Sequence, residues 1–537
     1  MNYISKNLDH LGIVAATCDK IGLVEAIDNL VGVDPRSEMT VGECVKLMVI
    51  NGLGFSSRPQ YLEAQFYDSK PINRLLGREM VSEKITDDRL GRALDRCYKS
   101  GCTEMFGAIA SQGALRFNVE KKFRCLDSTS MAVEGEYSKE EGIGLIKFGY
   151  SKDHRSDLKQ FMISLVSSQD GDVPLLAQTI AGNTSDTTHF REVLSSLKDQ
   201  IVEGEPLAYH VADAAMYSEK TIQEISDKIQ WITRIPEKIK AAKDLITGTS
   251  VEYMKPINEN YSYMEMGSNY GNIPQRWIVI HSQQAFYREE KTLTKNIKKE
   301  NESILKELKS FEKKEFDCEN DGINTLLTIG KKLKFHNIQI DSIETVRKKK
   351  GGKGRPKSSD EINLIYKIKG KIEECQKKIE KKKKKLGKFI IGTNELSSEK
   401  LTSEELLEHY KGQQSVERGF RFLKDPLFMT TSVFLKKQER IVALGMIMCL
   451  CLLVYTLAQR LLRKKLASES GYVKSQTGKL TQTPTLRWIF QVFEGTHVLI
   501  HQIENRVEEL VLNLNSERIK ILEFLGPAYQ KMYENAA

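Results

Sequence analysis

Apolar residues recur at helical spacing through the first part of the chain, over about residues 1–110. Within it, Thr40-Val41-Gly42-Glu43 has the capping-box pattern, in which a hydroxyl and a carboxylate three residues apart cap the start of a helix. A second helix is predicted through Leu90 and Leu94 and ends at Gly101. We therefore predict a helical N-terminal domain. Short helices of this kind can form a helix-turn-helix, although no groove-reading pattern accompanies them.

From about residue 120 the pattern changes to short apolar runs separated by helical stretches. The runs Phe123 to Asp127 and Leu207 to Asp213 each end on an aspartate, whereas the runs 161–166 and 231–235 contain none. Strands that alternate with helices predict an α/β layer, in which functional sites gather at strand ends. The two aspartates are therefore candidates for one site.

The last part of the chain contains a long apolar stretch. Ile441 to Gln459 are 19 uncharged, mostly apolar residues, enough to span a bilayer. Basic residues flank the stretch on both sides, so the flanks set no orientation. A helix that is apolar all round is also typical of the centre of a large domain, and we predict a buried helix rather than a membrane span. Residues 466–537 are predicted to be helical again.

The positive charge of the chain is concentrated in one segment. The 537 residues include 81 Lys and Arg against 72 Asp and Glu, a formal net charge of +9. Residues 288–388 alone hold 30 basic and 17 acidic residues, an excess of 13, which leaves the rest of the chain at −4. We interpret this segment as a module inserted into a near-neutral protein.

Apolar positions in the basic module recur at spacings of three, four or seven, which predicts two long helices paired antiparallel. The positions are Leu293, Ile297, Ile304, Leu308 and Phe311 in the first helix, and Ile365, Ile368, Ile372, Cys375, Ile379 and Leu386 in the second. The segment 347–357 between them is too rich in glycine and charge to fold alone. For the helices, a solvated coiled coil and a phosphate-binding arm are equally open, and for the basic loop we favour nucleic-acid contact.

The nine cysteines are scattered, with no Cys-x-x-Cys pair. This pattern argues against both a disulfide framework and a zinc module, and a reducing compartment fits best. The first residues lack a basic stretch followed by an apolar core, so we expect no secretory signal.

Three carboxylates form the candidate catalytic group: Asp127, Asp213 and Glu417. A helix predicted over 401–424 presents one polar stripe, made of Tyr410, Gln413, Glu417 and Lys424. Its neighbouring apolar seam is Val416, Phe420, Leu423 and Leu427. Converging carboxylates repel one another unless a cation neutralises them, and a pair of Mg²⁺ ions would also clamp the attacking and leaving oxygens of phosphoryl transfer. Taken singly, a strand-end aspartate is more often a turn residue, so spacing alone leaves the group open.

The stretch Tyr410 to Lys424 resembles the tyrosine-arginine-glutamate-lysine box of bacterial insertion-sequence transposases of the DDE class, with two, three and six residues between its members. The surroundings of Asp127 and Asp213 resemble the two aspartate motifs of that family. The runs 149–155 and 182–186, together with residues 7–100, are similar to one of its subgroups. One position departs from the box. Gln413 stands where the family usually has arginine, and a glutamine brings no charge to a phosphate.

The resemblance implies an α/β RNase H-like catalytic core interrupted by a large β-plus-coiled-coil insertion, with helical N- and C-terminal domains. The implied ranges are 1–110 for an N-terminal DNA-binding domain, 111–240 and 395–465 for the two parts of the core, 241–394 for the insertion with its basic helical hairpin, and 466–537 for the C-terminal region. The third acid of the family lies beyond the insertion, which agrees with the 204 positions between Asp213 and Glu417.

The resemblance also implies an activity. Such transposases cut DNA at the terminal inverted repeats of their element and join the 3′-OH ends to target DNA, often through a hairpin. Asp127, Asp213 and Glu417 would hold Mg²⁺, for which Mn²⁺ can substitute. The residues expected to contact DNA are Tyr410, Gln413, Lys424, Arg347, Lys348, Lys349, Lys350, Lys353 and Arg355. Trp231 and Trp277 are candidate stacking partners for a displaced base, although a core position is the more common one.

The expected partners are double-stranded DNA, as terminal repeats and as target, and a second copy of the chain in a homodimeric synaptic complex. The expected location is the cytoplasm, at the nucleoid, with no membrane. Other acids and histidines are expected to be solvated or to pack, namely Glu134, Glu136, Asp153, Asp157, His154, His189 and His210.

Two other hypotheses stay open. The first is a DNA-binding protein of the same architecture that has lost catalysis, although all three acids are present. A protein tethered to a membrane by Ile441 to Gln459 is the other.

Overall fold

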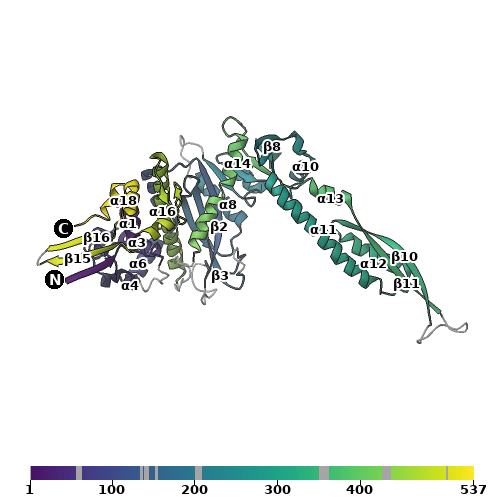
Figure 1. Ribbon diagram of the computed structural model, residues 1–537, viewed down its shortest axis with the longest axis horizontal. Helices are drawn as coiled ribbons and strands as arrows, with labels where there is room; N and C mark the ends of the chain where they lie inside the picture. Colours follow the sequence, from purple (N-terminus) through teal and green to yellow (C-terminus); the bar gives the residue numbers. More distant parts are fainter. Residues whose placement is uncertain are drawn as a thin grey trace. The chain divides into compact units, whose positions relative to one another are not determined.

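The computed structural model describes residues 2–55, 63–133, 137, 144–151, 155–199, 208–349, 362–425, 437–503 and 506–536. The chain divides into two units (Figure 1). Unit 1 comprises Met1–Thr233, Tyr270–Ile273 and Glu405–Ala537, and unit 2 comprises Arg234–Asn269 and Pro274–Glu404. Unit 1 is therefore built mainly from the two ends of the sequence, and unit 2 from its middle.

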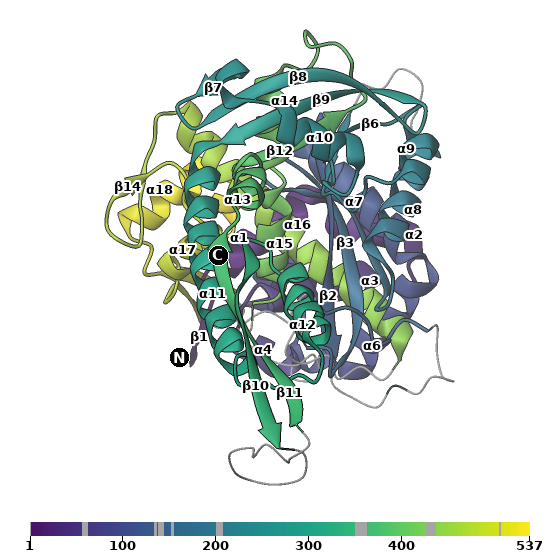
Figure 2. The same cartoon turned by 90° about the vertical axis from the view of Figure 1, so that its right-hand side faces the viewer.

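A mixed β-sheet forms the centre of unit 1 (Figure 2). Its strands lie in the order β4 (Pro174–Ala181), β3 (Lys159–Ser168), β2 (Phe123–Val133), β5 (Tyr209–Ala212) and β6 (Gln230–Arg234). β2, β3 and β4 are antiparallel, whereas β2, β5 and β6 are parallel. Helix α8 (Asp186–Asp199) contacts both β2 and α9 (Glu219–Ile225). The predicted α/β layer is confirmed as a mixed sheet with helices.

The N-terminal part of unit 1 is helical, as predicted. Its helices are α1 (Leu11–Ile21), α2 (Leu23–Val31), α3 (Val41–Gly52), α4 (Glu63–Asp68), α5 (Ile72–Leu76), α6 (Asp87–Lys99) and α7 (Cys102–Arg116), with a 3₁₀ turn at Ser82–Lys84. The exception is β1 (Asn2–Asn7), which pairs antiparallel with β15 (His497–Ile503) near the other end of the chain.

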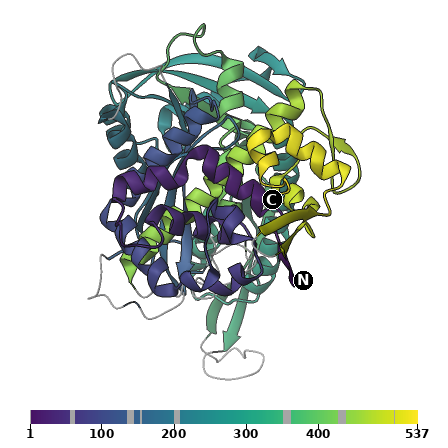
Figure 3. The same ribbon diagram turned by 90° about the vertical axis from the view of Figure 1, so that its left-hand side faces the viewer.

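The predicted helical region 466–537 is wrong in part, because it contains strands. β15 pairs with β16 (Arg506–Leu512), and Ala536 forms a bridge to Glu509, so both ends of the chain meet at one small sheet (Figure 3). Besides these strands the region holds the hairpin β13 (Val473–Lys474) and β14 (Leu480–Thr481), and the helices α17 (Leu486–Val492), α18 (Ser516–Leu525) and α19 (Pro527–Lys531). Valine, isoleucine and leucine dominate β15 and β16. The two strands pair with each other, and β15 also pairs with the distant β1.

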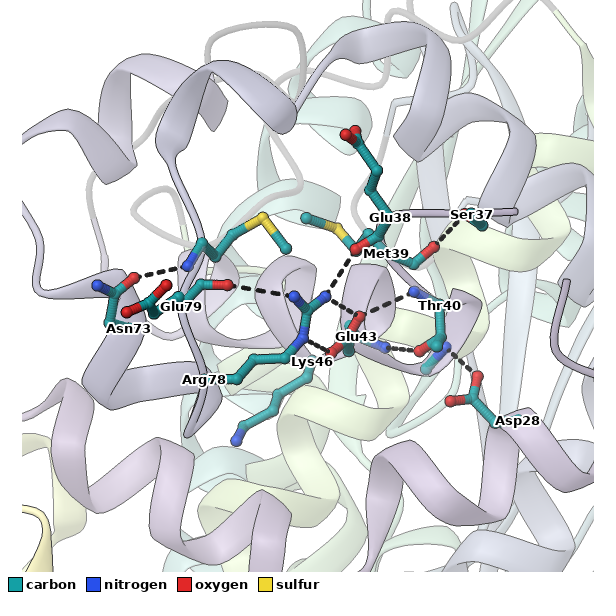
Figure 4. Close-up of polar contacts among 12 residues, drawn as sticks. Asp28, Ser37, Glu38, Met39, Thr40, Glu43, Lys46, Asn73, Arg78 and Glu79 are labelled. Atoms are coloured by element: carbon teal, nitrogen blue, oxygen red, sulfur yellow. Dashed lines mark hydrogen bonds and ion pairs between the residues drawn. The ribbon is translucent and has the colours of Figure 1, made fainter. Parts of the chain in front are cut away.

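The predicted capping box opens α3 (Figure 4). The Thr40 hydroxyl accepts a hydrogen bond from the Glu43 N–H at 3.1 Å, and the Glu43 Oε2 accepts from the Thr40 N–H at 2.8 Å. Arg78 donates to the same Glu43 Oε2 at 2.7 Å, so the cap also fastens the segment after α5. Glu43 is thus shared between a helix cap and an ion pair.

Replacing Thr40 by Ala is expected to lower the free energy of unfolding by about 1 kcal/mol, because the hydroxyl that caps α3 is lost. Urea unfolding of the purified variant measures the change. Thr294→Ala serves as the control, because this exposed threonine lies inside helix α11 rather than at a helix start. A drop for Thr294→Ala that equals the drop for Thr40→Ala would contradict the role of the cap.

The long apolar stretch forms the helix α16 (Gln438–Ser468) in the interior of unit 1. The helix is long and apolar enough to cross a membrane, but 89% of its most apolar window is buried against the protein. It contacts α1, α3, α6, α7 and β4. Arg460, 4% exposed, donates to the carbonyl oxygens of Phe117 (2.8 Å) and Asn118 (2.7 Å) and pairs with Asp170. These contacts support the predicted buried helix over a membrane anchor.

Unit 2 contains α10 (Lys240–Gly248), the 3₁₀ turn Val251–Tyr253 and strands in the order β12 (Lys388–Thr393), β9 (Ile273–Ser282), β8 (Tyr261–Tyr270) and β7 (Lys255–Asn258). The rest of unit 2 includes an arm, residues 283–383. The arm consists of α11 (Gln283–Phe311), α12 (Glu319–Lys331), the antiparallel hairpin β10 (His336–Lys349) and β11 (Ile362–Glu374), and α13 (Gln376–Lys383).

The second long helix predicted in the basic module is wrong, because residues 362–374 form the strand β11. Ile368 and Ile372 are four positions apart, a spacing that fits one face of a helix and one face of a strand equally well. β-branched isoleucines and the long pairing with β10 decide for the strand. The first predicted helix is present as α11, but it packs on a β-hairpin and on α12 instead of on a second long helix.

Two apolar clusters hold the arm together. Ile304, Leu308 and Phe311 of α11 pack with Leu326 of α12 and Ile368 of β11. A second cluster, made of Leu293, Phe335 and Ile379, joins α11 to α13. The arm therefore has a core of its own.

Candidate active site

Asp127 and Asp213 lie at matching positions on neighbouring parallel strands. Cys125 of β2 is paired with Val211 of β5, and each aspartate follows two residues later. Because side chains alternate along a strand, Asp127 points to the same face as Cys125 and Val211, and Asp213, the first residue after β5, comes at the position that the same alternation assigns to this face. The rings of Phe123 and Tyr209 stack on this face with centroids 5.3 Å apart. We call it the aspartate face.

Asp127 is not at the end of its strand, contrary to the sequence prediction. β2 continues to Val133 because it stays paired with β3 along its whole length, and only its parallel pairing with β5 stops at Cys125. Asp213 directly follows β5, as predicted. Asp127 therefore lies just beyond the point where the parallel pairing of β2 with β5 ends.

Backbone amides orient both carboxylates. Asp127 Oδ1 accepts a hydrogen bond from the Ser128 N–H at 2.7 Å, and Asp213 Oδ1 accepts from the Ala215 N–H at 2.9 Å. Both aspartates are half-buried. Two negative charges on adjacent strands repel each other, and a divalent cation with oxygen ligands would relieve this repulsion.

The histidine nearest to this pair in sequence carries no charge at neutral pH. Burial lowers the pKa of His210 to about 3, and the charge of Arg124 acts in the same direction. His210 is 3% exposed within β5. It therefore packs, as the sequence predicts.

The helix predicted over 401–424 is interrupted. It consists of α14 (Ser403–Lys411) and α15 (Gln414–Leu423), with a break at Gly412 and Gln413. A Cβ on Gly412 would come within 2.8 Å of the Gln169 side chain, so glycine permits a close approach there, and glycine also favours a break. Tyr410 and Glu417 are thus on separate helices, and the predicted single stripe is wrong.

These helices cover the aspartate face. The His409 ring of α14 stacks on Phe123 with centroids 3.3 Å apart. The Gln169 side chain donates to the His409 carbonyl oxygen at 2.7 Å and lies 3.1 Å from the Cys125 Sγ. α15 packs on both β2 and β3. The helix that carries Glu417 therefore lies on the strand that carries Asp127.

α15 buries the predicted apolar seam and leaves Glu417 exposed. Val416, Phe420 and Leu423 are at most 7% exposed, whereas Leu427 lies outside the described residues. Glu417 is in the first turn of α15, Gln413 precedes it at the N-cap, and Lys424 follows at the C-cap.

A divalent cation fits the aspartate pair better than it fits the whole triad. The oxygen donors of Asp127 and Asp213 share one face, and oxygen donors are what Mg²⁺ requires. Among the described residues, no group of three or more His, Cys, Asp or Glu side chains is close enough to hold a metal ion. Glu417 is therefore not grouped with the aspartates in this structure.

Only some of the basic residues of the arm that are predicted to contact DNA lie within the part of the chain that the structure describes. Arg347 is exposed, Lys348 pairs with Glu315, and Lys349 ends β10. Lys350, Lys353 and Arg355 lie outside the described residues. Ion pairs also join Lys369 to Glu344 and Lys371 to Glu373, which reduces the positive charge of the hairpin.

A second basic surface on α13 was not singled out from the sequence. Five lysines of this helix and its C-cap are exposed and, within the described part of the chain, pair with no carboxylate: Lys377, Lys381, Lys382, Lys383 and Lys384. We call them the α13 lysines. The run of lysines from 381 to 385 is the signal that identifies them in the sequence.

The tryptophans predicted as possible stacking partners are core residues. Trp231 is 0% and Trp277 is 2% exposed. Their indole N–H groups donate to Ser226 Oγ at 3.0 Å and Gln275 Oε1 at 2.9 Å. A base therefore has no access to either ring in this structure.

Among the other minor candidates, Asp157 is solvated and pairs with Arg155, and Glu134, Glu136, Asp153 and His154 lie outside the described residues.

The two glycine-containing runs that resemble a transposase subgroup meet around one buried glutamine. Gln160 is 2% exposed, and its Nε2 donates to the carbonyl oxygens of Tyr150 (3.1 Å) and Gly182 (2.7 Å). A Cβ on Gly149 would come within 2.0 Å of the Gly182 carbonyl oxygen, so only glycine fits there. These runs therefore make a close backbone contact near the start of β3.

Two family models match the chain. One is described as a transposase DDE domain and matches residues 119–454, and the other, a domain of unknown function (DUF4277), matches residues 3–111. No curated protein matches. One similar solved structure is the cryo-EM structure of a piggyBac transposase synaptic complex with hairpin DNA, which is 9% identical with a TM-score of 0.37 over 90% of this chain and 79% of that chain. The first match covers more than half of the sequence and contains Asp127, Asp213 and Glu417, and the chain accordingly belongs to the transposase DDE domain family.

Proposed function

We propose that the protein cleaves DNA at the terminal inverted repeats of its element and joins the 3′-OH ends to target DNA by two-metal phosphoryl transfer. The observation that carries this proposal is the alignment of Asp127 and Asp213 on one face of neighbouring parallel strands, under the helices that hold the box. The strand order β4-β3-β2-β5-β6 supports an RNase H-like core for the sheet of unit 1.

Asp127, Asp213 and Glu417 are the proposed ligands of Mg²⁺, and Mn²⁺ is expected to substitute. The bound metal would supply activation of a water or 3′-hydroxyl and charge neutralisation at the scissile phosphate. The chain itself orients the aspartates through the Ser128 and Ala215 amides. α15 would bring Glu417 to the site, since this helix packs on β2.

Contacts to the DNA backbone are proposed for two sets of residues. Tyr410, Gln413 and Lys424 flank Glu417 and would hold phosphates near the cut. The second set is the basic surface of the arm, made of the α13 lysines with Arg347, Lys348, Lys349, Lys350, Lys353 and Arg355. Phosphates attract such side chains without regard to sequence, so these residues supply affinity rather than specificity. A homodimer that holds one element end per subunit is the proposed assembly.

Replacing Lys377, Lys381 and Lys384 together by Gln is expected to weaken DNA binding and to reduce its salt dependence. Each lost phosphate contact removes about 0.9 from the slope of log K against log salt concentration, so the slope falls by about 3. Fluorescence anisotropy with a labelled duplex at several salt concentrations measures it. Lys371→Gln, which removes a lysine already paired with Glu373, is the control with a small expected effect. An unchanged slope in the triple variant would contradict this DNA contact.

The direct test of function uses DNA from both ends of the element that encodes the protein. Inverted repeats flanking the reading frame, with a short direct repeat outside them, identify these ends. The purified chain is expected to cut labelled repeat ends with Mg²⁺ or Mn²⁺ and not with EDTA. Binding of the repeats without cleavage under either metal would favour the second candidate, a DNA-binding protein that has lost catalysis.

A further inference from the structure

Two aromatic rings are exposed close together on unit 1. Tyr150 is 84% exposed, the highest value for any large apolar side chain among the described residues, and Phe148 is 58% exposed. Single exposed apolar residues are common on protein surfaces and need no explanation. Two large rings on one short segment leave a larger apolar area in water, and this arrangement suggests a partner for them.

The backbone beneath the rings is fixed. Lys147 and Gln160 exchange two backbone hydrogen bonds of 3.1 and 2.9 Å, and the Gln160 side chain holds the Tyr150 carbonyl oxygen. Leu145 is buried, and its N–H donates to Gln438 Oε1 of α16 at 2.7 Å. The segment is thus tied to both β3 and α16, and its packing directs the rings into solvent.

The Phe148 ring lies beside a lysine of the aspartate face of the sheet. β2 and β3 pair in unbroken register from Arg124 to Val133, with Asp127 opposite Leu165 and Val133 opposite Lys159. Paired residues share a face and alternate along the strand, so Lys159 is on the same face as Asp127. The Lys159 Nζ is 5.9 Å from the centroid of the Phe148 ring. Val133 is six positions from Asp127, which places the ring about 20 Å from Asp127 along the strand.

The positive charge beside the Phe148 ring favours a polyanion. Lys159 lies close enough to the Phe148 ring for a cation–π contact, whereas Lys147, which is paired with Gln160, is exposed on the opposite face. Proteins bind single-stranded nucleic acid with this combination, in which bases stack on aromatic rings and cations attract the phosphates between them. An apolar protein partner would make no use of a cation at the ring.

We propose that Phe148 and Tyr150 form a stacking platform for unpaired bases of DNA, with Lys159 contacting a phosphate beside them. The proposal rests on the proposed function, because the DNA that reaches the platform is the strand held at Asp127. A separation of about 20 Å corresponds to about six nucleotides at duplex rise, so the platform binds bases about that far from the cut.

The test compares two labelled probes, a 30-bp duplex and the same duplex with a six-nucleotide single-stranded adenine tail. The wild-type protein is expected to bind the tailed probe more tightly. Tyr150→Ala and Phe148→Ala are each expected to weaken binding to the tailed probe roughly 10-fold and to leave binding to the plain duplex unchanged. Tyr150→Phe keeps the ring and is expected to bind like the wild type. Tyr253→Ala, at a tyrosine that is 79% exposed in unit 2, is the matched control without an expected effect.

A second readout separates stacking from charge. With 2-aminopurine in the tail, stacking on the platform quenches the base fluorescence, and Tyr150→Ala is expected to abolish the quenching. Lys159→Gln is expected to lower the salt slope by about 1, whereas Tyr150→Ala leaves the slope unchanged.

Equal affinity of both alanine variants and the wild type for the tailed probe would overturn the platform and leave the proposed function intact. A loss of affinity for both probes together with a changed sedimentation coefficient would overturn it in favour of a contact between subunits. Failure of the wild-type protein to bind either probe would overturn the platform and the proposed function together.

Discussion

Replacing Asp127 by Asn is expected to slow Mg²⁺-dependent DNA cleavage by at least about 1,000-fold, equal to about 4 kcal/mol of transition-state stabilisation. Asparagine has the same shape, and its amide oxygen can still accept the Ser128 N–H, so β2 keeps its local structure. The substitution removes one negative charge from the aspartate face and with it an anionic ligand for the metal. Single-turnover cleavage of a labelled repeat end measures the rate.

Asp157→Asn is the matched control for this experiment. Asp157 is also in unit 1, but its side chain is 63% exposed and pairs with Arg155 at the surface. We expect full activity from this variant. Asp213→Asn should match Asp127→Asn, and the double variant should be little slower than either single one, because ligands of one metal centre act as a unit. Wild-type cleavage by Asp127→Asn would remove Asp127 from the site.

Replacing Glu417 by Gln is expected to abolish cleavage to a similar degree while leaving stability nearly unchanged. Glu417 is exposed, and surface substitutions usually change the free energy of unfolding by no more than about 0.5 kcal/mol. A large loss of activity without a loss of stability therefore indicates a role in chemistry. Single-turnover cleavage and urea unfolding of the same preparation give the two numbers.

Two further measurements make the Glu417 experiment decisive. Glu408→Gln, at an exposed glutamate of α14, is expected to cleave like the wild type. Mn²⁺ binding, followed by electron paramagnetic resonance, is expected to weaken in Glu417→Gln and not in Glu408→Gln. Unchanged cleavage and Mn²⁺ binding in Glu417→Gln would remove Glu417 from the proposed ligands, and another acid would then have to complete the site.

The two aspartates of the candidate site, and the apolar runs that precede them, could be identified from the local sequence. Asp127 and Asp213 each follow a short apolar run, and both runs are strands, because a buried strand in a mixed sheet is apolar on both faces. The register that places the two aspartates at matching positions of β2 and β5 could not be predicted from the sequence. It depends on which residue of β2 pairs with which residue of β5, and no spacing within either strand contains that information.

The errors arise where one pattern satisfies two structures. Ile368 and Ile372 fit a helix face and a strand face alike, and the pairing of β10 with β11 removed the ambiguity. The spacing of apolar residues predicts one continuous helix over 401–424, but the helix breaks at Gly412. At this position Gln169, from another part of the fold, occupies the space that a side chain would need. In both cases a contact distant in sequence decides the local conformation.

Because α16 is buried among the N-terminal helices, the order of synthesis determines when unit 1 can complete its fold. α1, α3, α6 and α7 leave the ribosome long before the helix that fills the space between them. At about 5–20 residues per second, synthesis from Arg116 to Ser468 takes roughly 20–70 s. During that time the middle of the chain can fold around the clusters of its arm, while the first helices keep apolar surface exposed and accessible to chaperones. A newly made chain therefore acquires its aspartate face late, after α15 and α16 have emerged.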